Sequence, residues 1–318
     1  MRIAMWATFG RAEVAARLAA LPGVDLILLD SKRQLLAGRL DDIEVFAAPA
    51  FFWDAEVAAA FRRDGRSLRF VQLLSAGYEE ITANGVPPGT VVANAGDAWS
   101  PAVAEHALGL LLGLVKDLPQ ALANQRRHVW DRAYSARMGT LRGRTLAIVG
   151  FGSIGREIAR YARPLGMRIV GLTRSGAPHE LADEMRPLAE LARVLPQAGA
   201  IVLAVAYAPA THHILGTAEL ARCRPEAVLV NIARGGLVDG AALAAALRRG
   251  AIAGAALDVT DPEPLPADSP LWECPNLILT PHTAGACGPA GSQRLAEVAA
   301  ANIGRFAAGR PLEHVLRL

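Results

Sequence analysis

The chain is poor in cysteine, and its cysteines lie far apart. Only three of the 318 residues are Cys, at positions 223, 274 and 287. Thiols with this spacing cannot build a disulfide framework or a Cys-x-x-Cys metal or redox pair, so a reducing cytoplasm is the expected location. No cluster of His, Cys and Asp has the spacing of metal ligands either, and we expect no metal.

Long apolar runs and blocks of like charge are also missing. The most apolar stretches, residues 106–115 and 198–208, are shorter than the ~20 residues that a membrane helix needs. The first residues lack the features of a signal peptide. The net charge is only +3, and the basic residues are scattered along the chain. We therefore expect neither a membrane nor a nucleic acid as a partner.

The sequence instead alternates short apolar runs with segments of helical period. Apolar residues make up 52% of the chain, enough for a large core. The alternation is typical of repeated βα units and parallel sheets with both faces covered. Strands are predicted at residues 2–5, 25–29, 45–47 and 70–73, and then at 145–149, 168–172, 200–205, 227–231, 253–258 and 277–279. The last six would make a Rossmann-type sheet, and the first four belong to a smaller unit.

The pattern changes between the two strand series. A long apolar helix is predicted at residues 101–115, followed by a segment, 128–144, that has no clear period. A closing helix at 291–308 can return to the first unit and make it discontinuous. The predicted fold is α/β, with two doubly wound parallel-sheet domains. A dinucleotide-binding domain of Rossmann type, residues 98–285, is inserted in a smaller flavodoxin-like substrate domain, residues 1–97 and 286–318.

A glycine-rich turn follows the first strand of the second series. Gly150-Phe-Gly-Ser-Ile-Gly155 lies between an apolar strand and an amphipathic helix, as a dinucleotide fingerprint requires. Gly150 permits the tight turn, Gly152 a close approach to pyrophosphate, and Gly155 close packing of helix on strand. The amides of Ser153 and Ile154 would face phosphate at the helix N-terminus. The alternative is a glycine-rich turn that binds no ligand.

The end of the next strand bears on cofactor choice. An NAD site would have Asp or Glu about 20 residues after the fingerprint. Here Thr173, Arg174 and Ser175 offer a cation and hydroxyl groups instead, which favours the 2′-phosphate of NADP(H) over NAD(H). The alternative is that Arg174 points to solvent and that either cofactor is accepted.

Three polar residues follow successive strands of the second series, where ligands of doubly wound sheets bind. Reduction of a 2-oxo acid needs a cation to hold the carboxylate and polarise the ketone, and an acid to protonate the alkoxide. Arg234 and His282 match these two requirements, and Glu263 would orient the imidazole of His282 and favour its protonated form. Singly, each residue could be structural, but together after three strands they predict catalysis.

Other polar residues are harder to place. Asp258 either binds the nicotinamide carboxamide or caps the end of its strand, and we predict the cofactor role. Ala233, which precedes Arg234, is also predicted to lie at the cofactor. His106, His212 and His213 have no comparable context and are predicted to be packing or surface residues.

Several of these motifs together resemble the D-isomer-specific 2-hydroxyacid dehydrogenase family, over nearly the whole chain. Besides the fingerprint they are Leu74-Ser-Ala-Gly77, Val103-Ala-Glu-His-Ala107, Asn231-Ile-Ala-Arg-Gly with Val238-Asp239, Leu257-Asp-Val with Pro262-Glu-Pro-Leu, and Thr280-Pro-His-Thr-Ala-Gly285. By this resemblance Arg234, Glu263 and His282 match the family's catalytic residues. Ser75, Ala76 and Gly77 match the loop whose amides hold the substrate carboxylate.

The resemblance also implies an assembly and a substrate. Family members dimerise across their cofactor domains, so residues 117–142 would form a dimer arm, with Trp130 reaching toward a neighbour. The end of the second strand is similar to that of NADPH-using glyoxylate/hydroxypyruvate reductases, and phenylpyruvate-type acids remain open. Ala76 stands where phosphite dehydrogenases have Lys, and Glu263 where formate dehydrogenases have Gln, which disfavours both activities.

Two other interpretations remain open from the residues. Corepressors that resemble this family keep the fold and the polar triad, so the chain could be an NAD(P)-sensing binding protein with little turnover. A generalist reductase without one substrate is the other.

The size of the substrate also remains open. Pro101 and Tyr78 depart from the family pattern. The aromatic residues Trp6, Phe51, Phe52 and Trp99 either narrow the substrate pocket or pack in the core.

Overall fold

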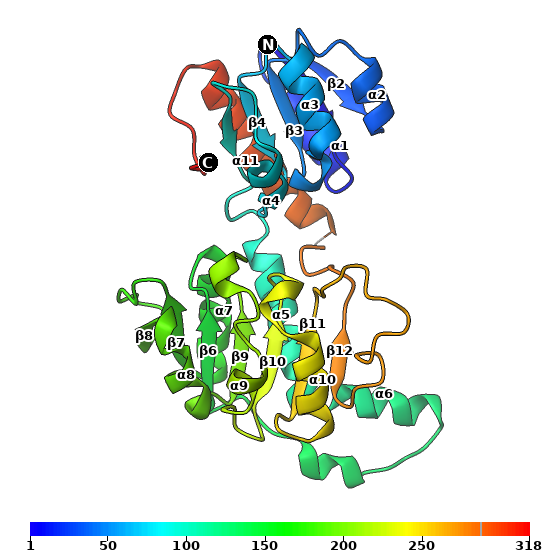
Figure 1. The fold of residues 1–318 in the computed structure, drawn as a ribbon, viewed down its shortest axis with the longest axis vertical. Helices are drawn as coiled ribbons and strands as arrows, with labels where there is room; N and C mark the ends of the chain where they lie inside the picture. Colours follow the sequence, from blue (N-terminus) through cyan, green and yellow to red (C-terminus); the bar gives the residue numbers. More distant parts are fainter. Residues whose placement is uncertain (287) are drawn as a thin grey trace. The chain divides into compact units, whose positions relative to one another are not determined.

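The computed structural model divides the chain into two compact units, each with its own parallel sheet (Figure 1). It describes residues 1–286 and 288–318, so Cys287 lies outside the described residues. Unit 1 consists of Met1–Trp99 and Ala286–Leu318, and unit 2 is Ser100–Gly285. The predicted fold class, two doubly wound α/β domains, is confirmed.

Unit 1 holds a five-stranded sheet in the order β2-β1-β3-β4-β5. This is the flavodoxin-like order, in which the chain winds in both directions from a central strand. The strands are β1 Arg2–Trp6, β2 Asp25–Leu29, β3 Val45–Ala48, β4 Phe70–Leu73 and β5 Val91–Ala93. The helices are α1 Arg11–Ala19, α2 Lys32–Ala37, α3 Ala55–Asp64, α4 Glu79–Asn84 and α11 Gly288–Ala307, and a 3₁₀ turn, η1, spans Ala50–Phe52. The central strands are fully buried because helices cover both faces, and α11 packs against α1 and β4.

Unit 2 holds a seven-stranded sheet in the order β12-β11-β10-β9-β6-β7-β8. Its first six strands in chain order have the Rossmann arrangement, with the order reversing beside β6. The strands are β6 Thr145–Val149, β7 Arg168–Thr173, β8 Glu184–Pro187, β9 Ala200–Leu203, β10 Val228–Asn231, β11 Gly254–Leu257 and β12 Leu277–Leu279. The helices are α5 Ser100–Val115, α6 Leu118–Arg126, α7 Ser153–Ala162, α8 Leu191–Val194, α9 Thr217–Leu220 and α10 Gly240–Arg248.

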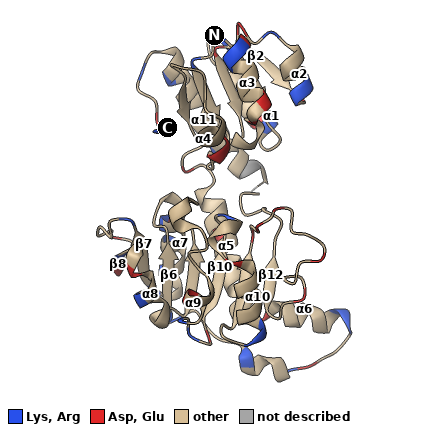
Figure 2. Ribbon diagram, viewed as in Figure 1, with Lys and Arg blue, Asp and Glu red and all other residues tan. Residues whose placement is uncertain are grey.

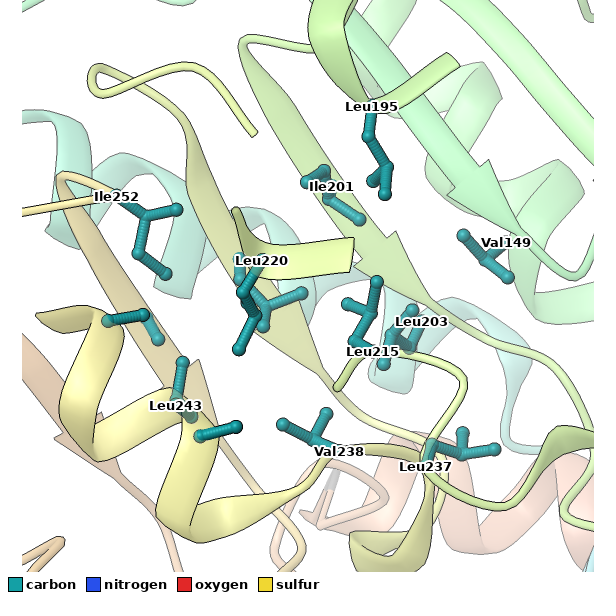
Figure 3. Packing of buried hydrophobic residues seen from close by; sticks show 14 of the residues in the cluster. Val149, Leu195, Ile201, Leu203, Leu215, Leu220, Leu237, Val238, Leu243 and Ile252 are labelled. Carbon is teal, nitrogen blue, oxygen red and sulfur yellow. The ribbon is translucent and has the colours of Figure 1, made fainter. Parts of the chain in front are cut away.

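The core of unit 2 fixes the central strands of its sheet. Figure 3 shows Val149 of β6 and Ile201 and Leu203 of β9 pointing toward side chains of the covering segments, among them Leu215 and Leu243. All five are at most 1% exposed. Burying one such side chain contributes roughly 1.5–3 kcal/mol, so the ends of these strands have little freedom to move.

Two strands were absent from the sequence prediction. β8 reads Glu-Met-Arg-Pro and lies at the edge of its sheet, so it has neither an apolar run nor strict alternation. β5 is only three residues long and is also an edge strand. Residues 128–144, the segment without a clear period, contain a 3₁₀ turn at Ala133–Arg137. The rest of this segment, between α6 and β6, is irregular.

Charge, hydropathy and possible metal ligands add three observations. Lys and Arg are distributed over many elements of both units (Figure 2). Among the described residues, no helix is long and apolar enough to cross a bilayer. In the same part of the chain, no three His, Cys, Asp or Glu side chains gather in a way that could hold a metal ion.

Candidate active site

The turn between β6 and α7 requires glycine at two positions and leaves open space at a third. Gly150 has a φ of 97°, and a Cβ on it would come within 2.4 Å of the Val205 nitrogen. A Cβ at Gly155 would lie 2.2 Å from the Gly150 carbonyl oxygen. A Cβ at Gly152 would meet nothing within 4 Å, and Gly152 leaves the N-terminus of α7 without a side-chain cap. Ser153 and Ile154 form the first turn of that helix, where free amides favour an anion.

The end of β7 turns sharply. Thr173 Oγ1 accepts a hydrogen bond from the Gly176 amide at 3.0 Å, and Ser175 Oγ accepts one from the Ala177 amide at 3.3 Å. Arg174 lies between them with an exposed side chain. Among the residues that the structure describes, no carboxylate pairs with its guanidinium, so this cation is available to a ligand.

Arg234, Glu263 and His282 follow β10, β11 and β12, which are neighbours in the sheet. The last residues of these three strands are paired with one another. Asn231 of β10 pairs with Leu257 of β11, which pairs with Leu279 of β12. Arg234 and His282 each follow three residues after such a paired position. The parallel register therefore brings the loops that carry them to the same edge of the sheet.

Arg234 is held by its own loop. The buried side chain of Asn231 accepts a hydrogen bond from the Ala233 amide at 3.1 Å and donates one to the Arg234 carbonyl at 2.8 Å. A guanidinium nitrogen of Arg234 donates to the Ala233 carbonyl at 2.7 Å. Gly235 is needed next because a Cβ there would come within 2.0 Å of the Thr260 carbonyl. The loops after β10 and β11 are therefore closely packed at Gly235, and Arg234, the residue before it, is half-buried.

His282 and Glu263 form a direct pair. Nδ1 of His282 lies 2.7 Å from Oε1 of Glu263, and both side chains are about half exposed. With Nδ1 engaged by the carboxylate, Nε2 is the nitrogen free to exchange a proton. His282 also has a φ of 53°, and its amide donates to the Asp258 carbonyl at 2.7 Å. A left-handed backbone at a histidine is unfavourable and persists only where its surroundings impose it.

Asp258 supplies that constraint. Its carboxylate accepts hydrogen bonds from Thr280 Oγ1 at 2.6 Å and from the amides of Thr283 and Ala284 at 2.9 and 3.0 Å. Burial acts to raise the pKa of this carboxyl, but the hydrogen bonds from His106, Thr280 and the two amides outweigh it and hold the pKa at about 2. Asp258 therefore stays charged and clamps the loop that carries His282.

His106 has contacts that the sequence did not predict. It was expected to be a packing or surface residue, and its Nε2 lies 3.1 Å from Thr280 Oγ1 and 3.4 Å from Asp258 Oδ1. His106 lies on α5, which packs against β10, β11 and β12. It thus joins a helix to the Asp258 clamp, and the only signal in the sequence was its place in the motif that begins at Val103.

The predicted carboxylate loop lies in unit 1, directly after β4. The hydroxyl of Ser75 accepts a hydrogen bond from the Ala50 amide and donates one to the Gly77 carbonyl, both at 2.9 Å. Asn94 donates to the Ala76 carbonyl at 2.9 Å. These contacts fix the loop through its hydroxyl and carbonyl groups, so the Ser75 side chain has a structural task here.

This combination of a Rossmann sheet, a glycine turn and paired catalytic-type side chains is matched by a known family. The sequence profile of the D-isomer specific 2-hydroxyacid dehydrogenase, NAD binding domain, matches residues 108–284. The chain belongs to the D-isomer specific 2-hydroxyacid dehydrogenase family. The predicted resemblance is confirmed, and with it the class of enzyme, an oxidoreductase.

Individual relatives of the dehydrogenase are similar over most of its length. A glyoxylate reductase of Thermococcus gammatolerans is 38% identical over 252 residues, 76% of this chain and 74% of the relative. A D-3-phosphoglycerate dehydrogenase of Methanocaldococcus jannaschii is 37% identical over 72% of this chain, which spans only 44% of that protein. The crystal structure of a D-isomer specific 2-hydroxyacid dehydrogenase from Xanthobacter autotrophicus Py2, in complex with NADPH and MES, has a TM-score of 0.82 and 27% identity, and covers 99% of this chain and 98% of that one.

The Asp258 clamp leads to a prediction for the dehydrogenase. Asn at this position keeps one acceptor oxygen and would turn an amide donor toward a backbone N–H, so Asp258→Asn should lower the melting temperature at pH 7. A pKa that falls to about 2 corresponds to about 2 kcal/mol of stability, present above about pH 4 and lost as the pH falls toward 2. The measurement is calorimetry between about pH 7 and 3.

The difference in melting temperature between Asp258→Asn and the wild type should narrow as the pH falls, because the wild type loses the same contribution. The exposed Asp268→Asn is the matched control and should melt like the wild type throughout. Equal melting temperatures of Asp258→Asn and the wild type at neutral pH would show that the hydrogen bonds of Asp258 do not stabilise this site.

Proposed function

We propose that the chain is an NADP(H)-dependent oxidoreductase that transfers a hydride between the nicotinamide ring and a small 2-oxo or 2-hydroxy acid. Glyoxylate and hydroxypyruvate are the first substrates to test, because relatives at 36–38% identity are named glyoxylate reductases. The observation that carries the proposal is the His282–Glu263 pair, on the sheet that also carries the glycine turn and Arg234.

The residues of unit 2 fit a dinucleotide. The uncapped N-terminus of α7 and the open space beside Gly152 suit a pyrophosphate, and Thr173 to Ser175 suit the adenosine end. Ala233 remains a predicted contact of the cofactor, and so does Asp258, although hydrogen bonds within the chain already engage its carboxylate oxygens. When bound, NADPH supplies the hydride.

The chain's own groups supply the rest of the reduction. The guanidinium of Arg234 binds the carboxylate and polarises the ketone so that negative charge can develop on its oxygen. The amides of the Ser75–Gly77 loop remain a predicted contact of a carboxylate. His282, as the imidazolium, donates the proton from Nε2 to that oxygen while Glu263 orients the ring. In the oxidation of a 2-hydroxy acid, the neutral imidazole of His282 is the base.

A direct assay tests this function. NADPH and NADH oxidation is followed at 340 nm with glyoxylate, hydroxypyruvate, pyruvate and phenylpyruvate. Rapid loss of NADPH with at least one acid supports the reductase. Measurable NADPH binding without turnover of any of the four would favour the nucleotide-sensing alternative.

Arg174 is expected to set the preference for NADPH. Its guanidinium is exposed at the end of β7, and the relative from Xanthobacter was crystallised with NADPH. The double variant Thr173→Asp/Arg174→Ala removes the cation and introduces a carboxylate for the ribose hydroxyls, so the ratio of kcat/KM for NADPH to that for NADH should fall at least tenfold. The matched control is Arg193→Ala, an exposed arginine on α8. An unchanged ratio would show that Arg174 does not determine the preference for NADPH over NADH.

We also propose a homodimer through the cofactor domains. The segment at residues 117–142 exposes several large apolar side chains, with Leu118 50%, Leu122 53% and Trp130 95% exposed. Apolar groups on a projecting segment favour a protein partner. Light scattering should give twice the 33.5 kDa mass of one chain, and a monomeric mass would reject the proposal.

A further inference from the structure

A buried glutamine interrupts the otherwise apolar strand β4. Gln72 is fully buried in a strand that reads Phe-Val-Gln-Leu. Its side-chain nitrogen donates hydrogen bonds to the carbonyls of Leu73 and Asn94, at 3.0 and 3.1 Å. Its side-chain oxygen accepts one from the side chain of Asn302, on α11, at 3.0 Å. A buried amide is costly unless its polar groups are bonded, and here these bonds connect β4 to two other segments of the unit.

The C-terminal segment, residues 313–316, is bonded to the same network. Asn302 is 2% exposed, and its side chain donates to the Glu313 carbonyl and accepts from the Glu313 amide, both at 2.8 Å. The carbonyl of His314 then accepts a hydrogen bond from the Asn94 amide at 3.2 Å. The segment also pairs with the edge strand β5. The position of Asn94 is therefore set by both Gln72 and the end of the chain.

Asn94 connects this network to the Ser75–Gly77 loop. Its side-chain nitrogen donates to the Ala76 carbonyl at 2.9 Å, and its side-chain oxygen accepts from the Gly96 amide at 3.0 Å. The peptide bond between Ala76 and Gly77 is trans, so its N–H points away from its carbonyl. A hydrogen bond that fixes the Ala76 carbonyl therefore also fixes the direction of the Gly77 amide, one of the groups predicted to hold a carboxylate.

We propose that Asn94 is a positioning residue for the carboxylate of the substrate. It holds the peptide between Ala76 and Gly77 so that the Gly77 amide faces the anion, and the C-terminal segment holds Asn94 in turn. This inference rests on the proposed 2-oxoacid reductase function. It gives the buried polar network a task in substrate binding, although none of its side chains touches the substrate.

Asn94→Ser tests this role while keeping the local turn. A serine hydroxyl can still accept from the Gly96 amide, as hydroxyl groups do in turns of this kind, but it is too short to reach the Ala76 carbonyl. KM for the 2-oxo acid that is reduced best should rise about three- to tenfold, the range expected for one lost hydrogen bond.

The other kinetic constants separate this effect from a general loss of activity. A contact made equally in the ground state and the transition state changes KM alone, so kcat should stay within about twofold of the wild type. The Kd of NADPH should also be unchanged, because the glycine turn and the end of β7 lie in unit 2. Steady-state kinetics gives KM and kcat, and fluorescence titration gives Kd.

Two further variants distinguish positioning from stability. Asn302→Ala removes another link of the network and should raise KM by a smaller factor, because it acts on Asn94 only through other residues. The matched control is Asn84→Ser, at a half-buried amide of α4 that donates to the carbonyls of Trp53 and Glu80, both at 3.0 Å. Neither of these partners belongs to the Ser75–Gly77 loop, so the control should leave KM unchanged even where it lowers the melting temperature.

Two outcomes would overturn the inference. The first is a wild-type KM in both Asn94→Ser and Asn302→Ala, which would leave the network a purely structural role, and the second is an equal rise in KM in Asn84→Ser. In each case turnover by the wild type leaves the proposed reductase function intact. A wild type that reduces none of glyoxylate, hydroxypyruvate, pyruvate and phenylpyruvate would instead reject that function, and the inference with it. If Asn94→Ser does not fold, the KM of Asn302→Ala decides.

Discussion

Replacing His282 by alanine is expected to lower kcat for 2-oxo acid reduction by about 10²–10⁴-fold, the usual contribution of a positioned general acid. The Kd of NADPH should change little, because the glycine turn and the end of β7 lie on other loops. Stopped-flow turnover gives kcat, and fluorescence titration of the nicotinamide gives Kd.

Two further variants distinguish loss of the proton donor from a structural defect. His212→Ala removes a histidine of the same unit, on the segment after β9, and should retain most of the activity. Since the His282 backbone is left-handed, a second variant, His282→Asn, tests whether strain at alanine contributes, because Asn tolerates this conformation better. Near-normal turnover by both His282 variants would mean that another group donates the proton.

The second large effect is expected at Arg234. Arg234→Ala should lower kcat/KM for a 2-oxo acid by about 10²–10³-fold, as for the loss of one preorganised donor to a developing oxyanion. Both a raised KM and a lowered kcat are expected, because in the proposed role the guanidinium binds the ground-state carboxylate and stabilises the transition state. Steady-state kinetics with NADPH held at saturation measures both.

Arg234→Lys sharpens this experiment. Lysine keeps the charge but not the planar fork that binds a carboxylate in two places, so it should recover only part of the lost kcat/KM. The Asn231 side chain bonds only to the Ala233 amide and the Arg234 carbonyl, both backbone groups, so neither substitution removes these hydrogen bonds. Unchanged KM and kcat in Arg234→Ala would show that the carboxylate is held elsewhere.

The sequence was informative where structure is set locally. Gly150 adopts a φ of 97°, and Gly155 has no room for a Cβ beside the Gly150 carbonyl. Such positions require glycine, so they can be recognised in the sequence. Strands buried on both faces appear as apolar runs, which is why β3 and β10 could be predicted. β8, a polar strand at the edge of its sheet, has no such mark.

Contacts between distant segments could not be predicted in the same way. His106 is separated from its partner Thr280 by 174 positions, and only the packing of α5 on the sheet brings them together. The Asp258 carboxylate has several possible uses at the end of a strand, and its hydrogen bonds to Thr283 and Ala284 become visible only in three dimensions. The hydrogen bond from the Ala50 amide to the hydroxyl of Ser75 could not be predicted either, because the two residues lie on different loops.

The division of the chain has a consequence for how such enzymes diversify. His282, Glu263, Arg234 and the Asp258 clamp all lie in unit 2, whereas the predicted carboxylate loop, Ser75–Gly77, lies in unit 1. With the roles proposed above, mutations in unit 1 can change which acid is recognised while the proton chemistry of unit 2 is inherited unchanged.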